Sequence, residues 1–295
     1  MKKNIIVVTG GAGFVGSNLI RKLLEFKSLK IISIDNYSSG TKKNHINSPR
    51  INYIKSHTNQ ISRILDKKKN KINCIFHFGE FARIYQSFKK LNDCISSNVN
   101  GSKAVFKFCL ENQIKLIYSA TSATLGNNGE DRNLSPYAFF KASNLEYLEN
   151  LKKWFKFKYE VVYFYNVYGP GQICNGDMAT VIGIFEDQYK NHKNLTVVKP
   201  GTQSRKFTHI YDTVDVCILA WKKNKNRHYS ISSEKSYTIL EVAKLFNRKI
   251  KFLPKRRGER YKSAVVQENL NNKIINKVCK RELTDYIEKI KKIVN

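Results

Sequence analysis

The sequence predicts an α/β protein in which a doubly wound parallel sheet carries a smaller C-terminal lobe. Three observations lead to this fold class. Short apolar runs alternate with amphipathic stretches in the first half of the chain, and a glycine-rich turn follows the first apolar run. After Tyr165 this alternation gives way to a segment rich in turn-forming residues. A chain of 295 residues with 41% hydrophobic content can also bury the core that such a fold requires.

Six short apolar runs are the candidate strands, and helical spacing fills the intervals between them. The runs are Ile5–Val8, Lys30–Ile34, Ile51–Lys55, Cys74–Phe78, Lys115–Ser119 and Glu160–Tyr165. Apolar residues recur with helical spacing from Val15 to Phe26, and again in Val99–Leu110 and Tyr137–Phe157. Because this alternation is typical of parallel sheets with right-handed crossovers, ligands are expected at the carboxyl ends of the strands.

The chain after Tyr165 predicts elements of a different kind. Residues 168–176 are rich in turn-forming residues and cannot continue a strand. Thr238-Ile-Leu-Glu241 is a capping box that opens an amphipathic helix. A strand-like run, Lys249–Leu253, follows, and a final helix begins at Thr284.

These elements predict two parts with a cleft between them. Residues 1–166, with a return segment at about 205–232, are expected to form a nucleotide-binding domain. Residues 167–204 and 233–295 are expected to form a smaller, substrate-binding lobe. We see no repeats and no disordered linker in the sequence.

The formal net charge of +30 is the most unusual feature of the composition. It fits compositional bias, attraction of an anionic small substrate, or contact with nucleic acid or another polyanion. The lysines are spread along the whole chain, and local clusters such as Lys67–Lys69 fall where surface turns are expected. No pattern of interleaved basic and aromatic residues stands out, so a nucleic-acid partner is not favoured.

The cysteines and the N-terminus indicate a cytoplasmic protein that does not enter a membrane. The six cysteines are Cys74, Cys94, Cys109, Cys174, Cys217 and Cys279. They are scattered without a C-x-x-C pair, so we expect reduced packing residues rather than a disulfide or metal framework. The apolar run Ile5–Val8 is too short for a signal peptide or a membrane span.

A glycine-rich turn, Thr9-Gly-Gly-Ala-Gly-Phe-Val-Gly16, joins the first predicted strand to the first predicted helix. Glycines let backbone N–H groups approach a pyrophosphate at a helix N-terminus, as in Rossmann-type dinucleotide sites. Asp35 ends the second strand about twenty positions further on, where it can bind the adenosine ribose. Because a carboxylate repels a 2′-phosphate, NAD is favoured over NADP, although Lys42 and Lys43 weaken this discrimination. A tight turn without a ligand is the alternative.

Tyr137 and Lys141 form the second motif, four residues apart in one predicted helix. Ser135 is a good N-cap and Pro136 suits the first helical position, so Tyr137 lies where the helix dipole favours negative charge. Lys141 is expected one turn further on the same face. The pKa of a free phenol is ~10, and lowering it to ~7 requires about 4 kcal/mol of stabilisation of the phenolate relative to the phenol. A lysine, a helix N-terminus and a positive nicotinamide ring can supply this stabilisation together. Such a tyrosine can take a proton from a sugar or alcohol hydroxyl as a hydride leaves the same carbon. Two unrelated surface residues are the alternative, which the polar strand end at Tyr118–Ala123 disfavours.

Over essentially its full length, the chain resembles the extended short-chain dehydrogenase/reductases, specifically the NAD-dependent nucleotide-sugar epimerase/dehydratase family. The resemblance rests on independent segments that occur in the family's order. They are Thr9–Gly16, Asp35–Gly40, Phe76–Gly79, Asn98–Gly101, Ser119–Ser122, Tyr137 with Lys141, Asn166–Pro170, Arg205–His209 and Arg256–Glu259. The resemblance implies NAD as the cofactor, a nucleotide sugar as the substrate (a UDP-sugar by family frequency), and a homodimer formed through helices of the first domain. The apolar-rich stretch Val99–Leu110 is compatible with such an interface and equally compatible with ordinary core packing.

The resemblance also implies roles for individual residues. Thr121 stands at the position of the catalytic Ser/Thr with Ser122 as its substitute, Tyr137 is the acid/base, and Lys141 promotes ionisation of that tyrosine and holds the nicotinamide ribose. With Tyr137 and Lys141, the implied cofactor-binding set is Gly10, Gly13, Phe14, Val15, Gly16, Asp35, Asn36, Ser39, Gly40, His57, Thr58, Phe78, Gly79, Glu80, Asn98 and Ser119. The implied substrate-binding set is Ser122, Asn166, Thr196, Arg205 and Arg256, with Arg257 as the alternative to Arg256. A guanidinium fork suits a pyrophosphate, and solvated surface is the other interpretation of these arginines.

Three departures from the family pattern stand out. Ser56–Thr58 occupies the stretch where the family has an acidic residue that reaches the adenine. Gly79–Ala82 replaces the commoner run of small residues, and Tyr163 replaces an arginine. None of these changes touches Thr121, Tyr137 or Lys141, which are the catalytic residues that the resemblance implies.

The residues after Thr121 bear on the reaction. In the related sugar 4,6-dehydratases an Asp-Glu pair follows the catalytic Thr, whereas Ser122 and Ala123 follow here, so water elimination lacks its acid and base. The same absence argues, less strongly, against related decarboxylases. The favoured hypothesis is C4 epimerisation of a UDP-hexose through a transient 4-keto sugar, and Asp35–Gly40 is typical of the NAD-using 4-epimerases. A nucleotide-sugar reductase, a 4,6-dehydratase, and a non-catalytic nucleotide- or polyanion-binding protein on the same fold are the alternatives.

Overall fold

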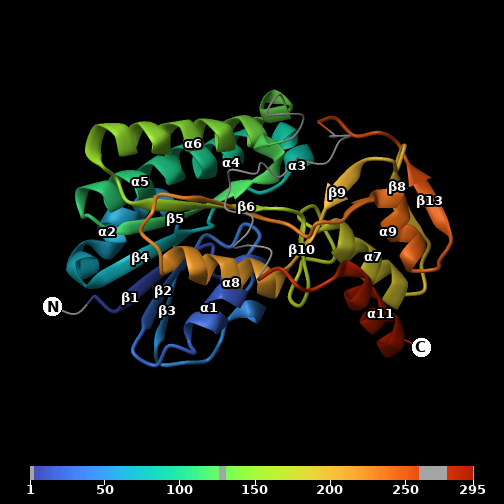
Figure 1. The fold of residues 1–295 in the computed structure, drawn as a ribbon, viewed down its shortest axis with the longest axis horizontal. Coiled ribbons are helices and arrows are strands. Elements are labelled where there is room, and N and C mark those ends of the chain that lie inside the picture. The colour runs from blue at the N-terminus through green and yellow to red at the C-terminus, as the bar shows by residue number, and fades with distance from the viewer. Residues whose placement is uncertain (1–2, 126–130, 259–277, 295) are drawn as a thin grey trace.

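The computed structural model describes residues 3–125, 131–258 and 278–294. Its centre is a seven-stranded sheet with the order β11-β6-β5-β4-β1-β2-β3, in which every pair of neighbours is parallel (Figure 1). The strands are β1 (Ile5–Thr9), β2 (Lys30–Asp35), β3 (Ile51–Lys55), β4 (Ile72–His77), β5 (Lys115–Thr121), β6 (Tyr159–Phe164) and β11 (His228–Ile231). The order of β1 to β6 is that of a doubly wound dinucleotide-binding sheet, which confirms the predicted fold class.

Helices cover both faces of this sheet (Figure 1). One face carries α2 (Ile61–Leu65), α5 (Ser102–Glu111) and α6 (Pro136–Phe155), and the other carries α1 (Phe14–Leu23) and α8 (Ile210–Trp221). Because side chains alternate along a strand, β1 contributes to both layers. Ile5 and Val7 belong to the core under α5 and α6, whereas Ile6 and Val8 belong to the core under α1 and α8.

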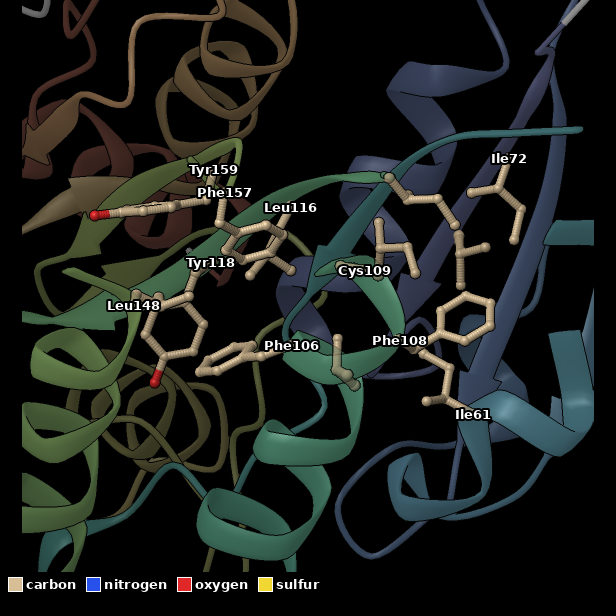
Figure 2. Close-up of a cluster of buried hydrophobic side chains, with 14 of the residues drawn as sticks. Ile61, Ile72, Phe106, Phe108, Cys109, Leu116, Tyr118, Leu148, Phe157 and Tyr159 are labelled. Atoms are coloured by element: carbon tan, nitrogen blue, oxygen red, sulfur yellow. The ribbon is translucent and has the colours of Figure 1, made fainter. Parts of the chain in front are cut away.

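Figure 2 shows the core between the sheet and α5 and α6. The Phe106 ring of α5 meets the Tyr118 ring of β5 nearly edge-on, with centroids 5.3 Å apart. Leu148 of α6 and Tyr159 of β6 extend the same buried cluster. This packing holds β5 and α6 against each other. Thr121 ends β5, and Tyr137 and Lys141 lie on α6.

The connection from β4 to β5 contains several short helices, whereas the sequence predicts one helix, Val99–Leu110. It contains α3 (Ile84–Lys89), α4 (Leu91–Ile95) and a wide π-helical turn (Ser96–Gly101) before α5 begins. The predicted helix Val99–Leu110 therefore starts inside the wide turn. Strand β4 also begins two residues earlier and ends one residue earlier than the predicted Cys74–Phe78. Single-turn 3₁₀ helices occupy Lys42–Asn44, Thr58–Gln60 and Ser122–Thr124, and a longer one occupies Asp66–Lys71.

A smaller lobe lies beside the carboxyl ends of the sheet strands (Figure 1). It contains α7 (Val181–Lys190), β8 (Leu195–Val198), β9 (Ser204–Lys206), β12 (Ser236–Thr238), α9 (Ile239–Leu245), β13 (Ile250–Leu253) and α11 (Leu283–Val294). Strands β8 and β13 pair in parallel, and β9 and β12 pair antiparallel. Phe185, Val242, Phe246 and Ile287 are buried in its core. The predicted capping box is present, with the Glu241 N–H donating to Thr238 Oγ1 at 3.1 Å.

Within the described ranges the chain passes between the sheet and the lobe repeatedly. It leaves after β6 through β7 (Val167–Tyr168), returns through β10 (Thr208–His209) into α8, and leaves again between β11 and β12. Residues 278–282, where Cys279 packs on the core under α8 and Arg281 contacts Asp212, lead into α11 of the lobe. Strands β7 and β10 pair in parallel at this junction. The two parts are therefore joined by paired backbone rather than by one flexible linker.

No helix among the described residues is long and apolar enough to cross a membrane. All six cysteines lie within the described ranges and are free thiols, four of them buried. Burial raises the pKa of the Cys74 thiol to about 12. Cys74, Cys94, Cys109 and Cys217 belong to hydrophobic core clusters, and Cys279 packs against one of them.

Candidate active site

A cavity of about 480 Å³ lies where the carboxyl ends of the sheet strands meet the lobe. Its lining combines the glycine-rich turn, the ends of β2, β4 and β5, the start of α6, and residues of the lobe. Its size is in the range of pockets that hold small organic ligands. Among the described residues, no group of three or more His, Cys, Asp or Glu side chains is arranged to hold a metal ion.

The glycine-rich turn is packed too tightly for side chains. Gly10 has a φ of +70°, and a Cβ atom there would lie 2.8 Å from the carbonyl carbon of Phe78. At Gly16 a Cβ atom would lie 2.1 Å from the Gly10 carbonyl oxygen. Helix α1 begins after Gly13 with no side chain capping its first turn. The cradle thus offers backbone N–H groups and the positive end of a helix, which fits the pyrophosphate of a dinucleotide.

Asp35 lies at the end of β2 and lines the same cavity. Its carboxylate accepts hydrogen bonds from the Ala12 N–H at 2.9 Å and the Tyr37 N–H at 2.8 Å. Burial raises the pKa of this carboxyl, and the two backbone donors oppose that rise. The side chain is therefore held next to the glycine-rich turn, at the place where the sequence predicts contact with the adenosine ribose.

Tyr137 lies in the first turn of α6, as the sequence predicts. The Ser135 hydroxyl accepts a hydrogen bond from the Ala138 N–H at 3.1 Å, and Pro136 occupies the start of the helix. The tyrosine side chain is buried among Phe81 and Ala123 and lines the cavity. Local sequence signals thus give this phenol its place in the wall of the pocket.

Lys141 lies one turn further along α6 and also lines the cavity. Its ammonium donates to the Ser119 carbonyl oxygen at 2.5 Å and forms a buried ion pair with Glu80. It also lies 4.7 Å from the centre of the Tyr118 ring, within the range of a cation–π contact. Tyr137 and Lys141 are therefore brought together in one wall of the pocket.

Thr121 and Ser122 are placed at the end of β5, in the wall of the same cavity. The Thr121 hydroxyl accepts a hydrogen bond from the Ala123 N–H at 3.2 Å and so caps the 3₁₀ turn that follows. Both residues are more than nine-tenths buried. Three predicted catalytic groups, the Thr121 hydroxyl, the Tyr137 phenol and the Lys141 ammonium, thus converge on one pocket.

The predicted substrate residues all line the cavity. They are Ser122, Asn166, Thr196, Arg205 and Arg256. The Asn166 amide donates to the Lys206 carbonyl oxygen at 2.8 Å, and Arg205 is buried. Arg256 lies over the Tyr85 ring and reaches the cavity, whereas Arg257 lies over the Phe88 ring and lines a separate, shallower pocket. The structure therefore favours Arg256 over Arg257 as the arginine that faces a ligand.

Four residues of the predicted cofactor set lie outside the cavity lining: Gly40, His57, Thr58 and Asn98. The Asn98 side chain turns into the protein, where it accepts from the Phe81 N–H at 2.7 Å and donates to the Phe81 carbonyl oxygen at 2.9 Å. The His57 ring bonds Ser96 at 3.2 Å. Asn98 supports the loop after β4 from behind, and the predicted contacts of these four residues with a cofactor stay predictions.

Arg83 is a residue of the cavity wall that the sequence analysis misses. It precedes α3, and its guanidinium Nε donates to the Met178 carbonyl oxygen at 3.0 Å, which links the sheet domain to the lobe. Burial lowers the pKa of this guanidinium, and the neighbouring Tyr137 opposes that effect. A basic residue soon after a strand that ends at the binding edge is a signal that could have identified it.

The family model for the NAD dependent epimerase/dehydratase family matches residues 6–232. A curated relative, the ADP-L-glycero-D-manno-heptose-6-epimerase of Brachyspira hyodysenteriae (strain ATCC 49526 / WA1), is 29% identical over 255 residues, which are 81% of this chain and 79% of that protein.

Two solved structures illustrate the likeness in three dimensions. The UDP-glucose 4-epimerase of Thermotoga maritima, determined with UDP-glucose, has a TM-score of 0.87 at 25% identity and covers 99% of this chain and 100% of its own. The UDP-N-acetylglucosamine 4-epimerase of Methanobrevibacter ruminantium M1, in complex with UDP-N-acetylmuramic acid, has a TM-score of 0.84 at 28% identity, with 100% and 98% covered.

Proposed function

The chain belongs to the NAD-dependent epimerase/dehydratase family, and we propose that it is an epimerase that inverts C4 of the sugar of a UDP-hexose. NAD is the cofactor of the family. The observation that carries the proposal is the convergence of Thr121, Tyr137 and Lys141 on the cavity that also contains the glycine-rich cradle. A protein that only bound nucleotides would have no need for a buried acid/base tyrosine in that wall.

The cradle and Asp35 would hold the cofactor, and the chemistry that NAD supplies when bound is the reversible acceptance of a hydride from carbon. Tyr137 takes the proton from the C4 hydroxyl as a general base. The Thr121 hydroxyl orients that sugar oxygen, and Lys141 stabilises the phenolate. Arg205 and Arg256 hold the pyrophosphate while the 4-keto sugar turns, and Tyr137 then returns the proton to the oxygen of the inverted carbon.

The distribution of carboxylates supports epimerisation over dehydration. Among the described residues that line the cavity, the carboxylates are Asp35 and Glu80. Asp35 belongs to the cofactor cradle, and Glu80 is paired with Lys141. Neither is free to act as the acid or the base of a water elimination, and Ser122 and Ala123 offer no carboxylate beside Thr121.

A second candidate reaction is inversion at C6 of an ADP-heptose. The observation that favours it is the 29% identity to a protein named as an ADP-L-glycero-D-manno-heptose-6-epimerase. The same acid/base set would serve, because only the carbon presented to Tyr137 differs. The two 4-epimerases that match in three dimensions at 25% and 28% identity favour a UDP-sugar.

The proposal is tested by incubating the purified protein, without added reductant, with UDP-glucose, UDP-N-acetylglucosamine or an ADP-heptose, and following the sugar by NMR. We expect the C4 epimer of a UDP-sugar to accumulate. Tyr137→Phe should lower the rate at least ~10²-fold, because the acid/base group is lost. Tyr211→Phe, at an exposed tyrosine of α8, is the control and should leave the rate unchanged.

Other outcomes separate the alternatives. Turnover that persists in Tyr137→Phe contradicts the proposed acid/base, and inversion of the heptose alone selects the second candidate. A 4-keto-6-deoxy product that absorbs ultraviolet light identifies a dehydratase. Stoichiometric consumption of a reduced cofactor with a keto-sugar nucleotide identifies a reductase.

A homodimer built on α6 is the assembly that we propose. Phe139 and Trp154 are large apolar side chains of this helix that are 50% and 63% exposed, and Phe155 is 59% exposed. Exposed aromatic residues along one helix are typical of a surface that a partner covers.

A further inference from the structure

The wall of the active-site cavity contains a buried charge that the proposed reaction does not require. Glu80 follows β4 in the loop that lines the pocket, and its side chain is 2% exposed. Its partner Lys141 is 4% exposed. Burying two charges costs free energy unless they are paired and hydrogen-bonded, and this pair meets both conditions.

The Glu80 carboxylate is saturated with donors. Its Oε1 accepts from the Ser102 hydroxyl at 2.8 Å, the Tyr118 hydroxyl at 3.1 Å and the Asn144 amide at 3.3 Å. Its Oε2 accepts from the Lys141 ammonium. A carboxyl group that accepts from donors on both oxygens is ionised and held in one orientation.

A chain of buried hydrogen bonds connects this carboxylate to the dinucleotide cradle. Thr9 Oγ1 accepts from the Phe78 and Gly79 N–H groups, so its own hydroxyl donates to His77 Nδ1 at 2.7 Å. The Nε2–H of His77 then donates to Ser102 Oγ at 3.0 Å, and Ser102 donates to Glu80. Burial lowers the pKa of His77 to about 4, so the ring is neutral, as this order of donors requires.

This arrangement leaves Lys141 one donor for a ligand. An ammonium has three N–H groups, and Ser119 O and Glu80 accept two of them. No described residue accepts a hydrogen bond from the third, and Lys141 lines the cavity together with Tyr137. Glu80 thus fixes the position of the Lys141 ammonium, and its negative charge offsets the positive charge of that ammonium.

We propose that Glu80 is a positioning residue that holds the Lys141 ammonium and balances its charge, so that the resting site favours the oxidised, positively charged form of NAD. This inference rests on the proposed function. A fixed anion stabilises a nearby cation, so it favours NAD⁺ over NADH. An epimerase gains from this bias, because each cycle must begin and end with the oxidised cofactor.

The groups that face the pair from the neighbouring elements keep their charge between pH 5 and 9. They are His77 of β4, Arg83 before α3, Cys94 of α4 and Tyr118 of β5, besides Tyr137 on α6 itself. Burial lowers the pKa of His77 to about 4, raises that of Cys94 to about 12, and raises that of Tyr118 well above its usual range. An arginine stays protonated throughout this range. A change in the pH profile of a Glu80 variant within this window therefore does not come from these four groups.

The direct test replaces the charge and keeps the shape with Glu80→Gln, and measures the affinities of NAD⁺ by calorimetry and of NADH by fluorescence. We expect the ratio Kd(NAD⁺)/Kd(NADH) to rise about tenfold, because the anion that favours the pyridinium is gone. Glu160→Gln is the matched control. Glu160 is a fully buried carboxylate of β6 that accepts backbone N–H groups of residues 225–227, and its loss should leave the ratio at the wild-type value.

The second readout is the pH dependence of kcat. In Glu80→Gln the acidic limb of the profile should move to lower pH by about one unit, because removing an anion makes protons in the site easier to release. Glu80→Asp keeps the charge but shortens the reach to Lys141, so its limb and its cofactor ratio should stay as in the wild type while kcat falls. A residue that only supported the fold would lower thermal stability without moving either quantity.

Each result of these measurements supports or contradicts the proposed role of Glu80. A Glu80→Gln protein with the wild-type cofactor ratio and the wild-type acidic limb overturns it. If the wild type epimerises no sugar nucleotide, the proposed function fails, and the cofactor ratio still decides the role of Glu80. If Glu80→Gln does not fold, Lys141→Met is compared with the Lys141→Met/Glu80→Gln double variant. The double variant should then unfold at the higher temperature, since the single variant leaves a buried carboxylate unpaired, and the reverse order overturns the inference.

Discussion

At Gly16 the backbone of the cofactor cradle leaves no room for a side chain. A Cβ atom there would overlap the Gly10 carbonyl oxygen at 2.1 Å, whereas at Gly13 the nearest atom would be 3.1 Å away. Both glycines belong to the same glycine-rich segment, but only Gly16 is severely crowded. Comparing alanine substitutions at the two positions therefore separates the free-energy cost of crowding from the cost of replacing a flexible glycine. The pattern of glycines between a strand and a helix is readable in the sequence, because the close approach of the backbone at this turn requires glycine.

Gly16→Ala should destabilise the protein by about 2 kcal/mol or more, because the turn must open to admit the methyl group. Gly13→Ala is the control and should cost less than half as much. Urea unfolding of both variants checks the difference. Equal losses of unfolding free energy would show that the turn accommodates a Cβ atom at Gly16 as easily as at Gly13.

Residues whose role follows from their neighbours in the chain could be predicted, and residues whose role follows from distant partners could not. Ser135, Pro136 and Tyr137 form a local helix-start signal, and the structure has that start. Glu80 is expected only to contact the cofactor, yet it pairs with a lysine 61 positions away. Arg83 is missed because its partner, the Met178 carbonyl oxygen, belongs to the lobe.

At the scale of elements, long periodic segments were predicted well and short ones were not. Helix α6 was expected at Tyr137–Phe157 and is found at Pro136–Phe155. Helices α3 and α4 are too short to show a 3.6-residue period, and strand β11 is a four-residue edge strand without an apolar run. Such elements form because packing holds them in place, and packing cannot be read from a local window.

Helix α6 places Tyr137 and Lys141 in the cavity wall and exposes aromatic side chains elsewhere, which leads to a prediction about assembly. Wild-type protein should have the molar mass of a dimer in light scattering after gel filtration. Trp154→Glu should shift the population to monomer, because a charge would be buried in the proposed interface. The control is Phe252→Glu, at a 44% exposed position of β13, which should leave the mass unchanged. Trp221 is not used as the control position because its indole donates a hydrogen bond to Asn73. A wild-type monomer at micromolar concentration contradicts the proposed dimer.

At the scale of the whole molecule, two buried histidines make the fold sensitive to acid. Burial lowers the pKa of His77 and of His209 to about 4 each, below the ordinary value of 6.5. The unfolded chain therefore binds more protons than the folded one below pH 6.5. Their contribution to stability is complete above that pH and is lost as the pH falls towards 4.

The unfolding free energy should fall by about 2 kcal/mol per histidine between pH 7.5 and pH 5. Urea unfolding in 0.5 M salt is the measurement, because salt screens the surface repulsion that a net charge of +30 creates and leaves buried groups unscreened. His77→Gln should reduce the pH dependence by about half. A variant with the full wild-type slope would show that His77 is not one of the groups that titrate.

The repeated passage of the chain between sheet and lobe has a mechanical consequence. A hinge turns easily when one or two backbone segments absorb the rotation, whereas here several connections, two of them paired as β7 and β10, oppose it. The Arg83 side chain, bonded to the Met178 carbonyl oxygen, links the same two parts. For the proposed epimerase this means that the sugar has to turn inside the cavity while its diphosphate end stays bound.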